Sequence, residues 1–324
     1  MSEFAMTKSG YHLILGGCGF IGRAVARELA SRGIDVVVAG RVPPIGLSSL
    51  GLPGRIDYRA FSLADADWDQ LIAGVAVIHH YAWSSLPASA NADPARDLAD
   101  NVVPTLRLLD AMRRQGAAAP RLVFASSGGT VYGRLRQIPV AEDHPLHPIT
   151  AYGVGKAAVE LYANQYNALY GLDCRIARIS NAFGAEQNAG RGQGAVTIFI
   201  QKALAGAPIE IWGDGTVTRD YIHVSDVARG LVALALAPQT EGPRTFNIGS
   251  GGGVSLNSLI DELASQLGRD LDVRRVEHRS FDVPTSVLDT TLARQILGWR
   301  PVVSFSNGIA MTIANFRGDT HRSV

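Results

Sequence analysis

The chain has 324 residues, 47% hydrophobic and 18% charged, a balance that indicates a folded globular protein and excludes a disordered one. Its 30 Lys and Arg nearly cancel its 29 Asp and Glu, so no overall field attracts nucleic acid or an anionic membrane. Two cysteines, Cys18 and Cys174, make no disulfide framework and fit a reducing cytoplasm. No apolar run reaches the roughly 18 residues of a membrane span. We therefore expect a soluble cytoplasmic protein.

Residues 1–9 are expected to be a disordered leader, because they lack the basic and apolar regions of a signal peptide and carry a second Met at position 6. Beyond them, short β-branched runs predict strands at 11–15, 35–39, 56–61, 75–80, 121–126 and 174–179. Amphipathic stretches between them predict helices at 21–31, 96–114 and 152–170. Strands that alternate with helices predict an α/β fold, a Rossmann-type doubly wound parallel sheet.

After Asn181 the chain becomes polar and rich in glycine, and its predicted elements become shorter. We interpret this part as a smaller α/β substrate-binding lobe over the carboxyl edge of the sheet, where doubly wound folds bind ligands. The predicted dinucleotide-binding domain is 10–180, with 216–249 packing back on it. The predicted substrate lobe is 181–215 and 250–318.

A glycine-rich loop, Gly16-Gly-Cys-Gly19-Phe-Ile-Gly22, follows the first predicted strand and opens a helix. Gly16 and Gly19 permit a tight turn and close approach to a pyrophosphate, and Gly22 permits close packing of the helix. The predicted cofactor is NAD. The second strand ends in Gly40-Arg41 where an acid would hold the ribose, so NADP is a second possibility.

Tyr152 and Lys156 lie four residues apart near the start of a predicted helix, so both project from one face. A phenol has a reference pKa of about 10, and a neighbouring ammonium and an oxidised nicotinamide both lower it. Tyr152 is therefore predicted to take a hydroxyl proton while the carbon gives hydride to the cofactor. With no paired His or carboxylates at ligand spacing, we predict no metal site.

Several motifs occur together in a fixed order. They are Val77-Ile-His79, Ser126-Ser-Gly-Gly-Thr-Val-Tyr132-Gly, Arg178-Ile-Ser-Asn181, Ile211-Trp-Gly-Asp-Gly215 and Arg219-Asp-Tyr-Ile-His-Val-Ser-Asp226. With the glycine loop and the Tyr/Lys pair, the chain resembles the extended short-chain dehydrogenase/reductase family over nearly its whole length, and within it the nucleotide-sugar 4-epimerases. The resemblance implies further cofactor contacts at Phe20, Ile21, Arg41, Ser62, Leu63, His80, Tyr81, Ala82, Asn101 and Ser126.

The family has a Ser or Thr hydroxyl four residues before the Tyr that here is Tyr132, but this chain has Gly128 there. Ser127 is the predicted substitute, with Thr130 in reserve. Related dehydratases and decarboxylases carry acids at the positions of Gly129 and Thr130, so their absence favours epimerisation over elimination.

For the substrate, the resemblance points to Asn181, Arg219 and Arg279 at a nucleotide diphosphate, Trp212 by the uracil and Asp282 near its ribose. An Arg that uronic-acid epimerases carry after their Asn-x-x-Gly motif is missing, which favours a UDP-linked neutral hexose or N-acetylhexosamine. The helices at 96–114 and 152–170 resemble the family's dimer faces, so a homodimer is expected. The alternatives are an NADP-dependent nucleotide-sugar reductase or dehydratase, and a catalytically idle dinucleotide-binding regulatory protein.

Overall fold

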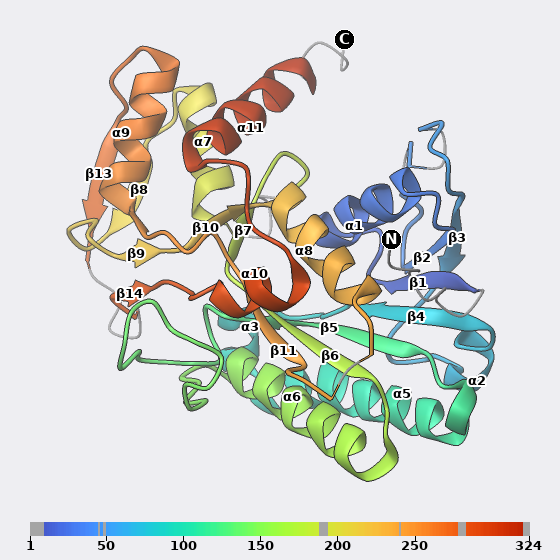
Figure 1. Ribbon diagram of the computed structural model, residues 1–324. Helices are drawn as coiled ribbons and strands as arrows, with labels where there is room; N and C mark the ends of the chain where they lie inside the picture. Colours follow the sequence, from blue (N-terminus) through green and yellow to red (C-terminus); the bar gives the residue numbers. More distant parts are fainter. Residues whose placement is uncertain are drawn as a thin grey trace.

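A parallel sheet forms the centre of the protein (Figure 1). The computed structural model describes residues 10–44, 46–47, 50–187, 194–239, 241–277 and 283–319. Within them the sheet has seven strands in the order β11-β6-β5-β4-β1-β2-β3. The strands are β1 (Tyr11–Leu15), β2 (Val36–Gly40), β3 (Ile56–Ala60), β4 (Val75–His80), β5 (Arg121–Ser127), β6 (Cys174–Ile179) and β11 (Thr245–Ile248). The predicted doubly wound parallel sheet is confirmed.

The strand order reverses at β1, whose neighbours are β2 on one side and β4 on the other. At the carboxyl end of the sheet, Leu15 lies in register with His80, and the next amide, that of Tyr81, donates to Leu15 O at 2.9 Å. A crevice opens outside such a reversal, because the chains leaving the two strands turn to opposite faces. The ligand site is therefore expected above β1 and β4.

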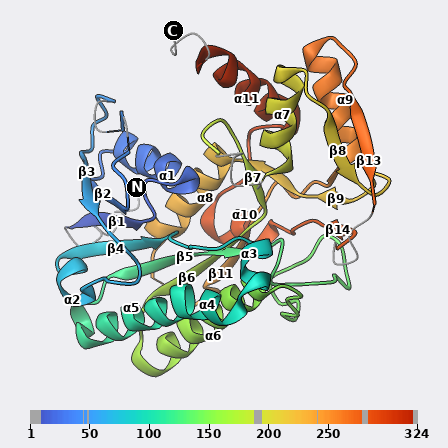
Figure 2. The same cartoon turned by 180° about the vertical axis from the view of Figure 1, so that it is seen from behind.

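Helices cover both faces of the sheet, as the two views show (Figures 1 and 2). One face carries α1 (Phe20–Ser31), α8 (Val224–Leu236) and α10 (Thr291–Leu297). The other carries α2 (Trp68–Leu71), α5 (Val103–Arg114) and α6 (Ala151–Tyr170). Leu29 and Leu231 are fully buried on the first side, as are Leu108 and Ala163 on the second. Burial of these faces supplies the main stabilisation of the layers.

The helix predicted at 96–114 is interrupted, which corrects the prediction. After α3 (Pro87–Ala92), the chain forms α4 (Pro94–Asp97), a π-helical turn η1 (Leu98–Val102) and then α5, which is followed by the 3₁₀ turn η2 (Gly116–Ala118). The wider π turn changes which side chains face inward, and such turns are common at functional sites. Asp97 and Asn101 are both buried here.

The remaining elements form a smaller lobe to one side of the sheet (Figure 2). They are β7 (Asn181–Phe183), α7 (Ala195–Ala205), β8 (Ile209–Trp212), β9 (Thr218–Arg219), β10 (Tyr221–His223), β12 (Val254–Ser255), α9 (Leu256–Leu267), β13 (Val273–Val276), β14 (Thr285–Ser286) and α11 (Phe305–Asp319). They share a core that includes Phe199, Ile211 and Leu263. α8 and β11, from the predicted segment 216–249, pack on α1 and pair with β6. The predicted domain limits stay a prediction.

Two further expectations concern the chain's surroundings. The predicted leader at 1–9 lies outside the described residues. Among the helices that the structure describes, none combines the length and the apolar character that crossing a membrane requires.

Candidate active site

The glycine loop lies at the carboxyl end of β1, directly against the chain that leaves β4. Gly16 has a φ of +78°, and a Cβ there would lie 2.8 Å from the amide nitrogen of Ala82. A Cβ at Gly22 would lie 2.6 Å from Gly17 Cα, so only glycine lets α1 pack this closely on the loop. The structure thus brings together the predicted residues Gly16, Gly19, Phe20, Ile21, Gly22, Tyr81 and Ala82.

The first turn of α1 is suited to a negatively charged group. Its N-cap is Gly19, which has no capping side chain, and no acidic residue occurs in the first turn. The first amides of a helix have no partner within it and carry partial positive charge. A pyrophosphate fits this terminus on the donors present.

The end of β2 explains the missing acid. A Cβ at Gly40 would lie 2.7 Å from Cys18 Sγ, so the thiol fills the space where an acidic side chain would begin. Arg41 follows on the surface. Beyond β3, Ser62 lies in a hollow of about 470 Å³ with Phe61 and Asp65, and the neighbouring Leu63 packs on the core below. A contact of Arg41, Ser62 and Leu63 with the cofactor stays a prediction.

The last residue of β4 is His80, and Tyr81 follows it. Their bulky side chains lie on opposite sides of the sheet. Tyr81 OH lies 2.8 Å from His79 Nδ1, and His79 Nε2 lies 3.0 Å from His12 Nδ1. His80 lies 2.8 Å from Thr105 Oγ1 by its Nε2 atom, and burial lowers its pKa to about 3. Both side chains therefore have partners in the core of the protein.

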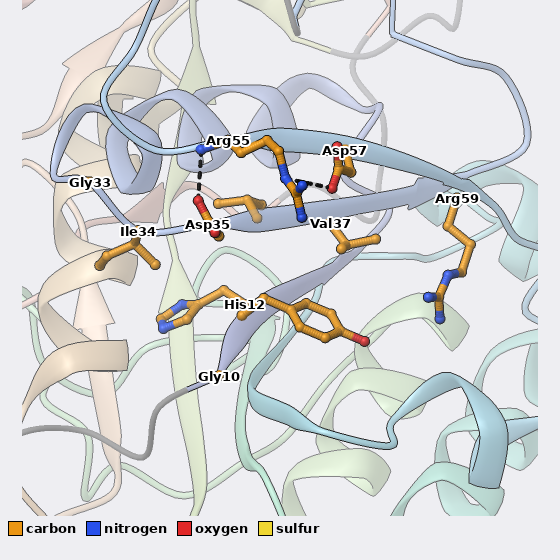
Figure 3. A pocket seen from close by; sticks show the side chains of 11 residues that line it. Gly10, His12, Gly33, Ile34, Asp35, Val37, Arg55, Asp57 and Arg59 are labelled. Atoms are coloured by element: carbon orange, nitrogen blue, oxygen red, sulfur yellow. Dashed lines mark hydrogen bonds and ion pairs between the residues drawn. The ribbon is translucent and has the colours of Figure 1, made fainter.

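A second hollow, of about 630 Å³, lies at the opposite, amino edge of β1, β2 and β3 (Figure 3). It is lined by His12, Asp35 and Arg55, and Arg55 forms an ion pair of 2.9 Å with Asp57 of β3, another lining residue. Because the chemistry of a doubly wound fold occurs at the carboxyl edge, we do not place the active site here.

The predicted catalytic pair, Tyr152 and Lys156, lies on the first turns of α6. Thr150 caps this helix by accepting from the Gly153 amide at 3.1 Å. A Cβ at Gly153 would lie 2.8 Å from Thr130 O, so the helix start is held against the turn after β5. Lys156 Nζ donates to Ala125 O of β5 at 2.8 Å. Tyr152, Lys156 and Thr130 are thus brought together.

The lowered pKa predicted for Tyr152 assumes an oxidised nicotinamide beside it as well as Lys156, and it stays a prediction. Burial raises the pKa of the phenol well above its ordinary value, and the Asp97 carboxylate raises it further. Burial also lowers the pKa of Lys156 to about 7, opposed by Asp97 and Glu160. The sequence shows the pair but not its burial, which by itself disfavours the charged form of either group.

The turn after β5 explains why glycine replaces the family's hydroxyl. A Cβ at Gly128 would lie 2.6 Å from Leu288 Cδ1, and Leu288 is fully buried. The half-buried Ser127 precedes it, and its carbonyl accepts from the Thr130 amide at 3.1 Å. Ser127 and Thr130 thus lie in one turn, and a catalytic role for either stays a prediction.

Two predicted cofactor residues are engaged elsewhere. The Ser126 hydroxyl donates to Glu160, which pairs with Arg178 at 2.7 Å in the core. Asn101 is fully buried, accepts from the Ser84 amide at 2.7 Å and donates to Asp97 at 2.9 Å. Their contacts with a cofactor stay predictions, but each has a structural partner.

Three predicted substrate residues belong to strands of the smaller lobe: Asn181 to β7, Trp212 to β8 and Arg219 to β9. A Cβ at Gly129 would lie 3.5 Å from Asn181 Oδ1, so this amide faces the catalytic turn. Trp212 is 38% exposed, which excludes a core role, and Gly213 N donates to Val276 O at 2.9 Å. Arg219 donates to Val283 O at 2.7 Å. Arg279 and Asp282, predicted near the same nucleotide, lie outside the described residues.

Glu186 has a partner that the sequence did not indicate. It pairs with Arg23 of α1 at 3.1 Å, so the loop after β7 is tied to the glycine-loop helix. Sequence reasoning also missed Trp83 and Asp97, although both lie against the catalytic helix at Gly155. No local motif marks either residue. Among the described residues, no three His, Cys, Asp or Glu side chains come together to hold a metal ion.

The fold and the site define a Rossmann-type protein with a glycine-rich loop and a Tyr/Lys pair at the switch point. Residues 12–249 match the model of the NAD dependent epimerase/dehydratase family. The chain belongs to this family, as the resemblance predicted.

Similar proteins agree over most of the chain. A UDP-glucose 4-epimerase of Mycolicibacterium smegmatis is 36% identical over 94% of this chain and 98% of that protein. The crystal structure of a Thermotoga maritima UDP-glucose 4-epimerase with UDP-glucose has a TM-score of 0.87 at 31% identity, covering 96% of this chain and 99% of that one. A Thermus thermophilus UDP-glucose 4-epimerase in complex with NAD has a TM-score of 0.84 at 30% identity, covering 95% and 99%.

A serine at position 128, where the family has its hydroxyl, is predicted to destabilise the protein. Gly128→Ser places its Cβ against Leu288 and should cost about 1–3 kcal/mol of unfolding free energy by overpacking. Gly129→Ser is the matched control: its Cβ meets only an ordinary contact, and we expect a change within about 0.5 kcal/mol. Urea unfolding measures both. Equal stability of the two variants would show that Leu288 is not the reason for glycine.

Proposed function

We propose that the protein is a nucleotide-sugar 4-epimerase that interconverts the C4 epimers of a UDP-hexose or UDP-N-acetylhexosamine with bound NAD. The observation that supports this is the packing of α6, which carries Tyr152 and Lys156, against the turn after β5, which carries Ser127: a Cβ at Gly153 would lie 2.8 Å from Thr130 O, and Lys156 donates to Ala125 O. Names of similar proteins support the sugar class, and the absence of acids at Gly129 and Thr130 supports epimerisation rather than elimination.

Each residue has a defined task in this proposal. Gly16, Gly19 and the first turn of α1 hold the pyrophosphate of the cofactor, which when bound supplies a hydride acceptor for the sugar carbon. Tyr152 takes the C4 hydroxyl proton, and Ser127 hydrogen-bonds the same oxygen. The 4-keto sugar then rotates, so that hydride returns to the opposite face of C4. Tyr152 returns the proton to the C4 oxygen.

Lys156 and the cofactor's positive charge have a necessary role, because Tyr152 is not acidic by itself. Burial raises the pKa of Tyr152, so its phenolate must be stabilised by nearby positive charge. Lys156 is the basic side chain of α6 beside it, with its ammonium 5.6 Å from the Tyr152 ring centroid. Proton removal therefore depends on Lys156 staying charged.

The activity test uses several sugars because the sequence does not name one. Incubated with UDP-glucose, UDP-N-acetylglucosamine and UDP-glucuronate, the protein should convert at least one into its C4 epimer. Tyr152→Phe should reduce turnover by at least about 10²-fold by removing the acid–base group, while Tyr170→Phe, an exposed tyrosine of the same helix, should not. Product chromatography measures conversion.

Two outcomes of this experiment would contradict the proposal. One is no conversion of any nucleotide sugar, and the other is full turnover by Tyr152→Phe, which would refute the base assignment. An intact Tyr152→Phe fold that still binds nucleotide separates loss of chemistry from loss of structure. In the same assay, Ser127→Ala and Thr130→Val decide which hydroxyl contacts the sugar.

An NADP-dependent reductase is the second candidate, because Cys18 fills the position of an acid at Gly40 and Arg41 follows. Mass spectrometry of nucleotide released from the denatured protein should find NAD if the main proposal holds. NADP, together with net loss of reduced-nicotinamide absorbance during turnover, would establish the reductase instead. A cytoplasmic location of the protein stays a prediction, which rests on its two cysteines.

We also propose that the protein is a homodimer through α6 and the neighbouring helices. Apolar side chains lie exposed along α6, among them Val154, Leu161, Tyr162 and Leu169. Val154 and Leu161 lie seven residues, or two helical turns, apart, as do Tyr162 and Leu169, so the four form one stripe along α6; Leu98 of η1 and Val103 of α5 are also exposed. A contiguous exposed apolar stripe is typical of an interface, and a two-fold axis would bury it against itself.

Dimerisation is tested by charge on the stripe. Leu161→Asp, at a residue that is 64% exposed, should convert a dimer into a monomer because burying an unpaired carboxylate is costly. Val302→Asp, at a residue 65% exposed in another region, should leave the dimer intact. Analytical ultracentrifugation measures both. A wild-type monomer, or an unchanged Leu161→Asp dimer, would contradict the proposal.

A further inference from the structure

The segment after β4 is fixed to the π turn by a buried hydrogen-bond network. Asn101 accepts from the Ser84 amide at 2.7 Å and donates to Asp97 at 2.9 Å, while the Ser85 hydroxyl donates to the same Asp97 oxygen. Trp83, the residue before Ser84, is thereby held in one place. The network therefore has a consequence at the site, because Trp83 faces the catalytic pair.

The Lys156 ammonium lies over the face of the Trp83 ring. The nitrogen lies 3.9 Å from the Trp83 ring centroid and 4.8 Å from that of Phe124. Lys156 is 3% exposed and makes one hydrogen bond, to Ala125 O. The Trp83 ring also meets Tyr152 at a centroid distance of 5.9 Å. A cation over a desolvated indole face is attracted by the ring's quadrupole.

Asp97 supplies negative charge on the same side. It is 3% exposed, and its Oδ2 has no hydrogen-bond partner among the described residues. A Cβ at Gly155 would lie 3.2 Å from this oxygen and 3.1 Å from Trp83 Cζ2. The absence of a side chain directly before Lys156 is therefore what lets the carboxylate and the indole edge reach α6.

Other ionisable groups face Lys156 from the elements around it, but they are engaged or neutral. Glu160 of α6 pairs with Arg178 at 2.7 Å and accepts from Ser126. His80 of β4 lies 2.8 Å from Thr105 Oγ1, and its lowered pKa leaves it uncharged at neutral pH. Tyr152 is a protonated phenol in the protein alone. Asp97 is thus the carboxylate near Lys156 that pairs with no other cation among the described residues.

We propose that Asp97 and Trp83 are positioning residues that keep Lys156 in its ammonium form and aimed at the catalytic tyrosine. The indole face and the carboxylate together replace the water that burial removes. The consequence for catalysis rests on the proposed function, whereas the charge and place of Lys156 do not.

The chain is well suited to a direct test because it has three lysines, Lys8, Lys156 and Lys202. In full-length protein with ¹³C-labelled lysine, three Cε signals are expected, and Lys156→Met identifies the buried one. Its midpoint should lie near 7, because burial lowers the pKa of Lys156 to about 7. Its protons should also show an upfield ring-current shift from Trp83.

Asp97→Asn should lower the Lys156 midpoint by at least about one pH unit, since a nearby opposite charge favours the charged form. The control is Asp100→Asn, in the π turn that follows Asp97, whose side chain is 43% exposed and pairs with Arg96. It should leave the midpoint unchanged. Nucleotide content is matched between samples by absorbance, because bound nucleotide also carries charge.

A folded Asp97→Asn protein with the wild-type midpoint would overturn the proposal. If Asp97→Asn does not fold, Trp83→Leu decides: the ring-current shift should disappear and the midpoint should fall. An unchanged Lys156 signal in Trp83→Leu, or a wild-type Lys156 that titrates together with Lys8 and Lys202, would also overturn it. None of these readings needs turnover, so a missing epimerase activity would leave them intact.

Discussion

The site depends on how closely α6 lies against the chain leaving β4 and β5. Gly153 and Gly155 lie between Tyr152 and Lys156 on this helix. A Cβ at Gly153 would lie 2.8 Å from Thr130 O, and one at Gly155 would lie 3.1 Å from Trp83 Cζ2. This approach lets Lys156 reach Ala125 O and carries Tyr152 to the catalytic turn. A helix one side chain further away would hold neither group in place.

Buried carboxylates fix the other sides of the site. Asp220, which is 1% exposed, accepts from the Ser250 amide and hydroxyl, each at 2.7 Å, and from the Leu288 amide at 3.2 Å. Asp220, between β9 and β10, is thus joined to the loop after β11 and to the segment after β14, where Leu288 packs on Gly128. Buried charges with several amide donors are stable, whereas losing them leaves unpaired groups. The smaller lobe is therefore held to the sheet by polar contacts as well as by its core.

The sequence was sufficient for the elements whose pattern is local. The strand 75–80 is uniformly buried and apolar except for its histidines, and the loop from Gly16 to Gly22 is a short motif between a strand and a helix. The π turn at 98–102 was not predictable, because the 3.6-residue pattern continues through it. The reason for Gly128 lies in Leu288, far away in sequence.

The pKa values of Tyr152 and Lys156 likewise depend on contacts that the sequence does not show. Tyr152 and Lys156 are visible as residues, but the direction of their pKa shifts depends on burial and on Asp97, which no motif connects to them. Likewise, the hydroxyl of Ser126 looks available in the sequence, yet it is engaged by Glu160. Tertiary contacts between separate elements decide these points, and a single sequence does not display them.

In the proposed reaction, hydride leaves the sugar at C4 and returns to the same carbon within one binding event. A UDP-hexose that the protein converts, labelled with deuterium at C4, tests this directly by mass spectrometry of the product. The account predicts an epimer that keeps its deuterium at C4, with no label in free nicotinamide or solvent. Loss of the label from C4 during conversion would contradict it.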